Sequence, residues 1–140
     1  MKSFKLFISE SLGSWFGNSK VVDDHGDPLM VYHGTQKRFD IFKTPTWFSD
    51  KYEFADSFSA DWGDIGERTP ESRVIKAYLR IENPYETSDW GDTEPSRSNP
   101  DWMQKLIDQG YDGIHFTEHS AFGIETEWVA FYPEQIRIVE

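Results

Sequence analysis

Residues 125–136 read ETEWVAFYPEQI, and the prediction of the fold starts from this stretch. Aromatic and β-branched residues dominate it, acids stand at its start and Pro133 follows its last aromatic residues, which is typical of a β-strand. An acid at a strand end beside bulky aromatic residues is easily directed into a cleft. An ordinary strand with solvated acids at its start has the same pattern, so the stretch alone predicts a strand and leaves the role of Glu127 open.

Two segments upstream favour a functional role for Glu127. Residues 31–35 read VYHGT and residues 46–50 read TWFSD. The order along the chain is therefore aromatic-His-Gly-Thr, then aromatic-Phe-Ser-Asp, then Glu-aromatic-Val. Each motif is short and common, but all three in this order form a specific pattern, with WFGNSKVVD at 15–23 before them and PEQI at 133–136 after them.

This pattern resembles the ADP-ribosyltransferase fold of the diphtheria-toxin and poly(ADP-ribose)-polymerase type. It resembles more closely the small transferase domains found in phage polyvalent proteins, over residues 15–139. The resemblance implies an α+β fold in which split antiparallel β-sheets and a few short helices surround an NAD cleft. It also implies the activity, because this family cleaves the nicotinamide–ribose bond of NAD and passes ADP-ribose to an acceptor.

The local patterns along the chain also predict α+β. A helix is expected after residue 50, with Ser49 or Asp50 as its cap, and another over residues 101–109, where Asn99 and Pro100 precede it and Gly110 ends it. Polar segments predict surface loops at 61–72, a candidate lid, and at 85–98 and 120–126. Strands are expected at 20–22 and 29–33, which form a hairpin, and at 46–48, 74–81, 114–116, 127–132 and 135–139.

The first ten residues are predicted to be separate from the rest. Residues 1–10 have the apolar spacing of a short helix, and they are also similar to the leaders of internal head proteins of large tailed phages. In those leaders a prohead protease cuts after Leu/Ile-x-Glu, and residues 8–10 read ISE. The expected division is therefore a capsid-targeting leader or N-terminal helix at 1–10 and an ADP-ribosyltransferase-like domain at 11–140.

Composition limits the classes of function. A chain of 140 residues most simply forms one domain, and its formal net charge of −11 argues against binding to nucleic acid or to anionic membranes. The absence of cysteine excludes disulfides, thiolate metal ligands and a cysteine nucleophile. No apolar run approaches the length of a transmembrane helix. His115 and His119 are four residues apart, but the first is expected in a strand and the second in a loop, so both are interpreted as structural rather than as metal ligands.

The resemblance implies specific roles for individual residues. Glu127 and His33 are the expected catalytic residues, with Glu127 bonding the 2′-hydroxyl of the ribose and His33 another ribose hydroxyl of NAD. The backbone of Gly34 is expected to hold the nicotinamide carboxamide, and an aromatic ring to stack on the nicotinamide. The expected NAD-binding set, with no metal, is His33, Gly34, Thr35, Trp47, Phe48, Ser49 and Phe58.

Three positions depart from the patterns of related enzymes. Trp47 stands where poly(ADP-ribose) polymerases carry a tyrosine, and Ala55 stands where they often carry a serine that bonds the carboxamide. Glu125 and Glu127 form a Glu-x-Glu pair, which is similar to arginine-modifying transferases of a sister clan, where the first Glu engages the acceptor guanidinium. The pair therefore implies a basic protein side chain as acceptor, with Glu125 on the acceptor side.

The function expected from the sequence is a phage mono-ADP-ribosyltransferase that uses NAD as substrate and modifies a basic host protein. It would act as a monomer in the host cytoplasm after infection, or be packaged in the phage head, without membrane or nucleic-acid partners. Alternatives are an enzyme of the same fold that hydrolyses NAD or modifies a nucleic acid, a catalytically inactive acidic binding or inhibitor protein, and an unrelated structural protein of a virion.

Overall fold

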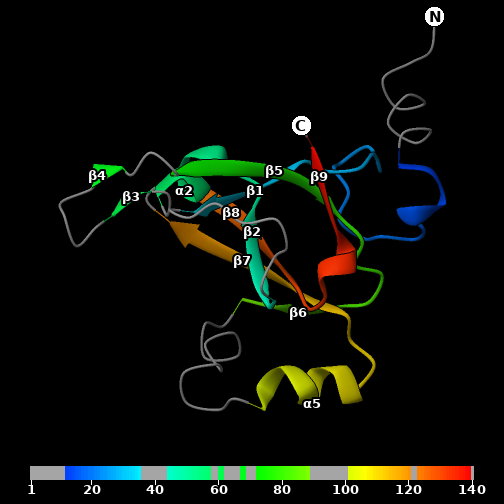
Figure 1. Ribbon diagram of the computed structural model, residues 1–140. Coiled ribbons are helices and arrows are strands. Elements are labelled where there is room, and N and C mark those ends of the chain that lie inside the picture. Colours follow the sequence, from blue (N-terminus) through cyan, green and yellow to red (C-terminus); the bar gives the residue numbers. More distant parts are fainter. Residues whose placement is uncertain are drawn as a thin grey trace, which may run out of the picture.

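The structure is a computed structural model, and it describes residues 12–35, 44–57, 60–61, 67–68, 72–88, 101–120 and 123–139. These residues form one large sheet, a two-stranded ribbon and a few short helices (Figure 1). The helical elements are η1 (Gly13–Trp15), α2 (Tyr52–Ser57), α5 (Trp102–Asp108) and η3 (Pro133–Gln135). The strands are β1 (Val31–Thr35), β2 (Thr46–Ser49), β3 (Ala60–Asp61), β4 (Glu67–Arg68), β5 (Arg73–Leu79), β6 (Pro84–Thr87), β7 (Gly113–Ser120), β8 (Gly123–Ala130) and β9 (Ile136–Val139).

The large sheet has seven strands in the order β6-β7-β8-β2-β1-β5-β9. All neighbouring pairs are antiparallel except β6 and β7, which run parallel with Tyr85 opposite Ile114. The α+β class is confirmed, but the expectation of antiparallel sheets is wrong at this edge. A parallel pair needs a crossover connection, and here the chain between β6 and β7 includes α5.

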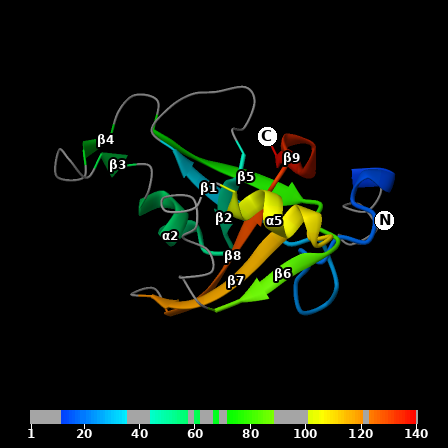
Figure 2. The same cartoon turned by 90° about the horizontal axis from the view of Figure 1, so that it is seen from below.

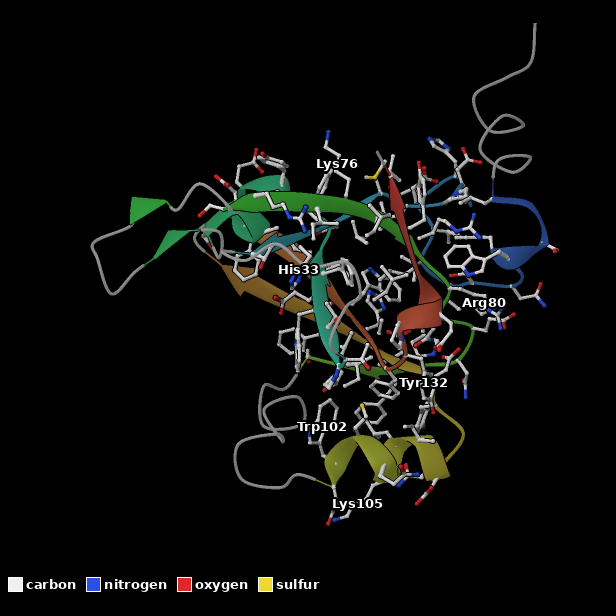
Figure 3. All side chains as sticks on the ribbon, in the orientation of Figure 1. His33, Lys76, Arg80, Trp102, Lys105 and Tyr132 are labelled. Atoms are coloured by element: carbon white, nitrogen blue, oxygen red, sulfur yellow. The ribbon has the colours of Figure 1, made fainter. Side chains whose placement is uncertain are left out.

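Apolar side chains cover both faces of the sheet. One cluster contains Phe48 and Trp128 together with residues of β1 and β5, and the other contains Val129 and Phe116 together with Trp102 of α5. Figures 1 and 2 show α5 lying against the β6–β7–β8 side of the sheet. Trp102 is 6% exposed and points from α5 toward the strands, whereas Lys105 points away from them (Figure 3). Because successive residues of a strand face opposite sides, Trp128 and Val129 belong to different clusters.

Several local predictions are confirmed. The expected strands at 46–48 and 74–81 correspond to β2 and β5, and the expected helix at 101–109 corresponds to α5, after which Gly110 has a φ of 96°. The hairpin expected at 20–33 is reduced to an isolated bridge between Val22 and Pro28, followed by β1.

Two predicted loops are wrong in part. Residues 84–87 form β6, and the segment 120–126 belongs largely to a long hairpin in which β7 and β8 pair from Gly113↔Ala130 to Ser120↔Gly123. His119 therefore lies in β7 and not in a loop. The candidate lid at 61–72 contains parts of the β3–β4 ribbon. The predicted leader at 1–10 lies outside the described residues.

Candidate active site

Glu127 is a buried acid in the middle of the sheet. It lies on β8 opposite Phe116 of β7 on one side and opposite Ser49 of β2 on the other. The residue is 5% exposed, and its Oε2 atom is buried. Carboxylates are rarely buried to this degree, because an ion loses favourable hydration in the interior. A buried carboxylate at this position has an energetic cost, which is expected at a functional site rather than in a purely structural strand.

His33 lies on β1, and its side chain reaches the backbone of the neighbouring strand β2 (Figure 3). Its Nδ1 atom is 2.7 Å from the backbone oxygen of Trp47, and its ring is tilted against Phe48 at a centroid distance of 5.5 Å. Because a carbonyl oxygen can only accept, Nδ1 carries a proton. Burial lowers the pKa of His33 below 6.5, although the bond to the Trp47 backbone opposes this shift. His33 is therefore neutral at neutral pH, and in this tautomer its Nε2 atom is an acceptor.

The two halves of the sheet meet at β1 and β2. Within the described residues these strands pair at one position, Tyr32↔Ser49, whereas β1 and β5 pair over five consecutive positions from Val31↔Ala77 to Thr35↔Arg73. Beyond the Tyr32 pair, the His33 imidazole provides the hydrogen bond to the Trp47 carbonyl. The hydrogen bond to this carbonyl therefore comes from a side chain of β1 and not from a backbone N–H. The two backbones can then lie farther apart there than in a regular antiparallel pair. The prediction of split sheets is therefore wrong, because the seven strands form one connected sheet, in which β1 and β2 pair at fewer positions than the other neighbours.

The register places several expected site residues next to one another. Ser49 stands directly between Tyr32 and Glu127 in a row across β1, β2 and β8. His33 is the next residue on β1, and its ring contacts Phe48, whose side chain lies on the other face of the sheet from Ser49 and Glu127. Neighbouring strands lie about 4.8 Å apart, so this row spans roughly 10 Å. Ser49 is itself buried, and its Oγ atom accepts a hydrogen bond of 3.0 Å from the backbone N–H of Lys51.

Trp47 is anchored to the helix that covers this part of the sheet. It is opposite Val129 in the register, and its ring centroid is 6.3 Å from that of Trp102 on α5. Trp47 is half-buried, so part of its side chain faces solvent. Trp47, Ser49 and Glu127 share one face of the sheet, because Trp47 and Ser49 are two residues apart and Ser49 is directly opposite Glu127.

The remaining expected residues are only partly described. Gly34 and Thr35 lie in β1, where they are opposite Val74 and Arg73 of β5. The backbone of Glu125 lies in β8 opposite Glu118. Phe58 lies outside the described residues. Across the part of the chain that the structure describes, no group of three or more His, Asp or Glu side chains could hold a metal ion.

Sequence reasoning missed the role of Asp50. The sequence predicts Ser49 or Asp50 as the cap of the helix that follows, but the Asp50 Oδ1 atom accepts a hydrogen bond from the backbone N–H of Thr126, beside Glu127. The position of Asp50 immediately after the Trp-Phe-Ser strand was visible in the sequence. The partner, 76 residues away along the chain, was not.

The class of protein follows from the fold, the buried acid and a comparison of the chain with protein families. Residues 23–140 match the family described as ADP-ribosyltransferase in polyvalent proteins. The chain belongs to this family, whose members use NAD as the source of ADP-ribose. Comparison with curated proteins and with solved structures gave no match. None of the helices in the described ranges has the length and apolar character needed to cross a membrane.

Proposed function

We propose that this chain is a phage mono-ADP-ribosyltransferase that modifies a side chain of a host protein. In this reaction the bond between C1′ of the ribose and the nicotinamide nitrogen breaks, and its electron pair leaves with the nicotinamide. The acceptor atom then bonds to C1′ and releases its proton. The observation that carries the proposal is the buried Glu127 carboxylate, which lies in one row with Ser49 and Tyr32 where β1 and β2 diverge.

Glu127 is the residue proposed to stabilise the transition state. Positive charge develops on the ribose as an oxocarbenium ion when the nicotinamide leaves, and a fixed carboxylate stabilises that charge. Burial strengthens this effect, because the dielectric constant of the protein interior is lower than that of water and screens charges less. The same carboxylate would accept a hydrogen bond from the ribose 2′-hydroxyl.

His33 is proposed to position a ribose of NAD through its Nε2 atom. The bond from Nδ1 to the Trp47 carbonyl fixes the tautomer and the direction of the ring. The lowered pKa of His33 keeps the ring neutral at physiological pH, so Nε2 can accept from a hydroxyl. Protonation would turn Nε2 into a donor and remove this interaction.

The nicotinamide is proposed to lie beside the backbone of Gly34. β1 is bound to β5 at Gly34, and its opposite edge faces the point where β2 diverges. Backbone groups there would bind the carboxamide, and Trp47 and Phe58 are the aromatic residues proposed to stack on the ring. Ser49 and Thr35 are proposed to complete the surroundings of this site, whereas Phe48 is 1% exposed and would support it from the core.

The proposed acceptor is a basic side chain on a host protein. Glu125 precedes Glu127 by two positions, in the first half of β8. A guanidinium would match such a carboxylate in both charge and geometry. The net charge of −11 adds a long-range attraction for basic proteins.

Labelled NAD tests this proposal directly. NAD with a label on its adenine half is incubated with bacterial lysate and wild type, Glu127→Gln or Glu134→Gln, the last being a control because Glu134 is exposed on η3. We expect wild type and Glu134→Gln to label discrete lysate proteins. The rate with Glu127→Gln should fall by about 10²–10³, as when a preorganised electrostatic contact is lost.

The other outcomes identify the alternatives. Consumption of NAD without labelled protein, in lysate and with purified basic proteins, would indicate an NAD glycohydrolase. No consumption of NAD by wild type would leave an inactive binding or inhibitor protein and would contradict the proposal.

A further inference from the structure

We propose that Asp50 is a positioning residue that sets the place of the Glu127 carboxylate by binding the backbone of Thr126. The inference rests on the proposed function, because it assigns Asp50 a part in catalysis through Glu127. Asp50 follows the last residue of β2, and Thr126 lies between the two acids of the Glu-x-Glu pair.

Asp50 binds both backbone polar groups of Thr126. The Asp50 N–H donates to the Thr126 carbonyl at 3.0 Å, and the Thr126 N–H donates to the Asp50 Oδ1 at 2.9 Å. In a regular antiparallel pair the second bond would go to the carbonyl oxygen of residue 50. The chain turns toward α2 after Ser49, and the carboxylate takes over the role of that carbonyl. A hydrogen bond to an ionised carboxylate is shorter and stronger than one to a neutral acceptor.

This pair of bonds restrains the segment that carries Glu127. Successive residues of a strand direct their N–H and C=O groups to opposite neighbours. The backbone N–H and C=O groups of Thr126 point toward β2, where they bind Asp50. The backbone groups of Glu127 therefore point toward β7. After Glu127, the Phe48↔Trp128 pair restrains β8 from the β2 side, whereas before Glu127 this restraint depends on Asp50, because Ser49 is the last paired residue of β2.

The carboxylate of Asp50 binds β8 instead of capping α2. An Asp just before a helix commonly accepts from the first N–H groups of that helix. In this structure Ser49 Oγ accepts from the backbone N–H of Lys51, and Asp50 Oδ1 accepts from the distant strand β8. α2 has only six residues. The Asp50 carboxylate therefore does not stabilise this short helix as a cap, and instead it fixes the position of β8.

The variants at position 50 separate geometry from charge. Asp50→Ala removes the acceptor, Asp50→Asn keeps an acceptor oxygen without the charge, and Asp50→Glu keeps the charge but moves the oxygens by one methylene. Glu53→Ala is the matched control, because Glu53 is an exposed acid on α2. NAD cleavage is measured as kcat and KM, and amide hydrogen exchange is measured for residues 123–130.

We expect Asp50→Ala and Asp50→Glu to lower kcat by about tenfold or more, because small displacements of a catalytic group reduce rates strongly. KM for NAD should change by less than about threefold, since Asp50 does not bind the substrate in this proposal. Asp50→Asn should restore most of the rate that alanine loses, and Glu53→Ala should match wild type. Exchange at Thr126 should be faster in Asp50→Ala and close to wild type in Asp50→Asn.

Several results would overturn the positioning role. These are wild-type kcat in Asp50→Ala, a rise in KM at unchanged kcat, or a wild-type rate in Asp50→Glu together with a low rate in Asp50→Asn. If Asp50→Ala does not fold, the Asn and Glu variants decide by the same comparison. If wild type does not cleave NAD, the proposed function fails by itself. Amide exchange then decides on Asp50, and equal exchange at Thr126 in wild type and the variants would overturn its restraint of β8.

Discussion

At the scale of single residues, the proposed reaction depends on the protonation states of two groups, the buried Glu127 and the half-buried His33. In the proposed reaction Glu127 acts as an anion that stabilises a cation, and a neutral His33 accepts a hydroxyl proton. The structure favours the neutral form of His33, because removal from water lowers its pKa more than the bond to the Trp47 carbonyl raises it. The same bond determines which nitrogen of the ring carries the proton.

The lowered pKa of His33 makes the stability of the protein depend on pH. The folded-state pKa lies below the ordinary value of 6.5, so between these two values the unfolded chain binds more protons than the folded one. The contribution of His33 to stability is fully present above 6.5 and is lost as the pH falls from 6.5 through the folded-state pKa. We expect wild type to lose more free energy of unfolding between about pH 7.5 and about pH 5.5 than His33→Gln, which cannot titrate.

Urea denaturation of the two proteins at both pH values measures this difference. The carboxylates that also titrate are common to both, so their effects cancel in the comparison. An equal loss in the two proteins, or a larger loss in His33→Gln, would contradict the assigned shift.

At the scale of elements, the predictable parts are those in which the residues themselves determine the structure. β2 and β5 contain β-branched and aromatic residues, and α5 has a proline before it and a glycine after it, so local patterns were sufficient. The end of the β7–β8 hairpin reads TEHS and GIET, which is polar enough to look like a loop. Its strand structure comes from pairing between the two segments. Likewise, the local pattern predicts that Asp50 can cap the following helix, whereas its hydrogen bond to Thr126 depends on the fold, which brings the two residues together.

Gln135 connects three separate elements and explains part of the PEQI motif. Its Oε1 atom accepts from the backbone N–H groups of Phe131 and Tyr132, just after β8. Its Nε2 atom donates to the carbonyls of Arg80, after β5, and Asp112, before β7. The side chain is buried at 7% exposure, so water cannot easily replace these partners.

Replacing Gln135 by leucine should therefore destabilise the fold without touching the site. The change keeps a similar volume but leaves buried backbone groups without this partner, and each such group costs about 1–3 kcal/mol. We expect a loss of at least about 3 kcal/mol in the free energy of unfolding, measured by urea denaturation. Gln104→Leu is the control, because Gln104 is exposed and its side chain bonds Asp108 within the same helix. Equal effects of the two substitutions would show that the bonds of Gln135 do not stabilise the fold.

At the scale of the whole molecule, charge affects the two proposed substrates in opposite ways. The chain has 14 Lys and Arg against 25 Asp and Glu, so its field repels anions and attracts cations. NAD is an anion because of its diphosphate, and a basic protein acceptor is a cation. Favourable long-range attraction therefore assists only the second substrate.

Salt separates these two contributions in one experiment. The screening length is about 10 Å at 0.1 M salt and about 3 Å at 1 M, so high salt removes steering of a basic acceptor. Between about 0.05 M and about 0.5 M NaCl we expect the rate of protein labelling to fall at least about tenfold. Hydrolysis of NAD in the absence of acceptor should stay within about twofold or rise, since repulsion of NAD is screened. Parallel loss of both rates would indicate that salt acts on the fold or on the Glu127 site. Labelling that is insensitive to salt would show that the acceptor is recognised through short-range contacts, and the basic acceptor would then lose its support from the net charge.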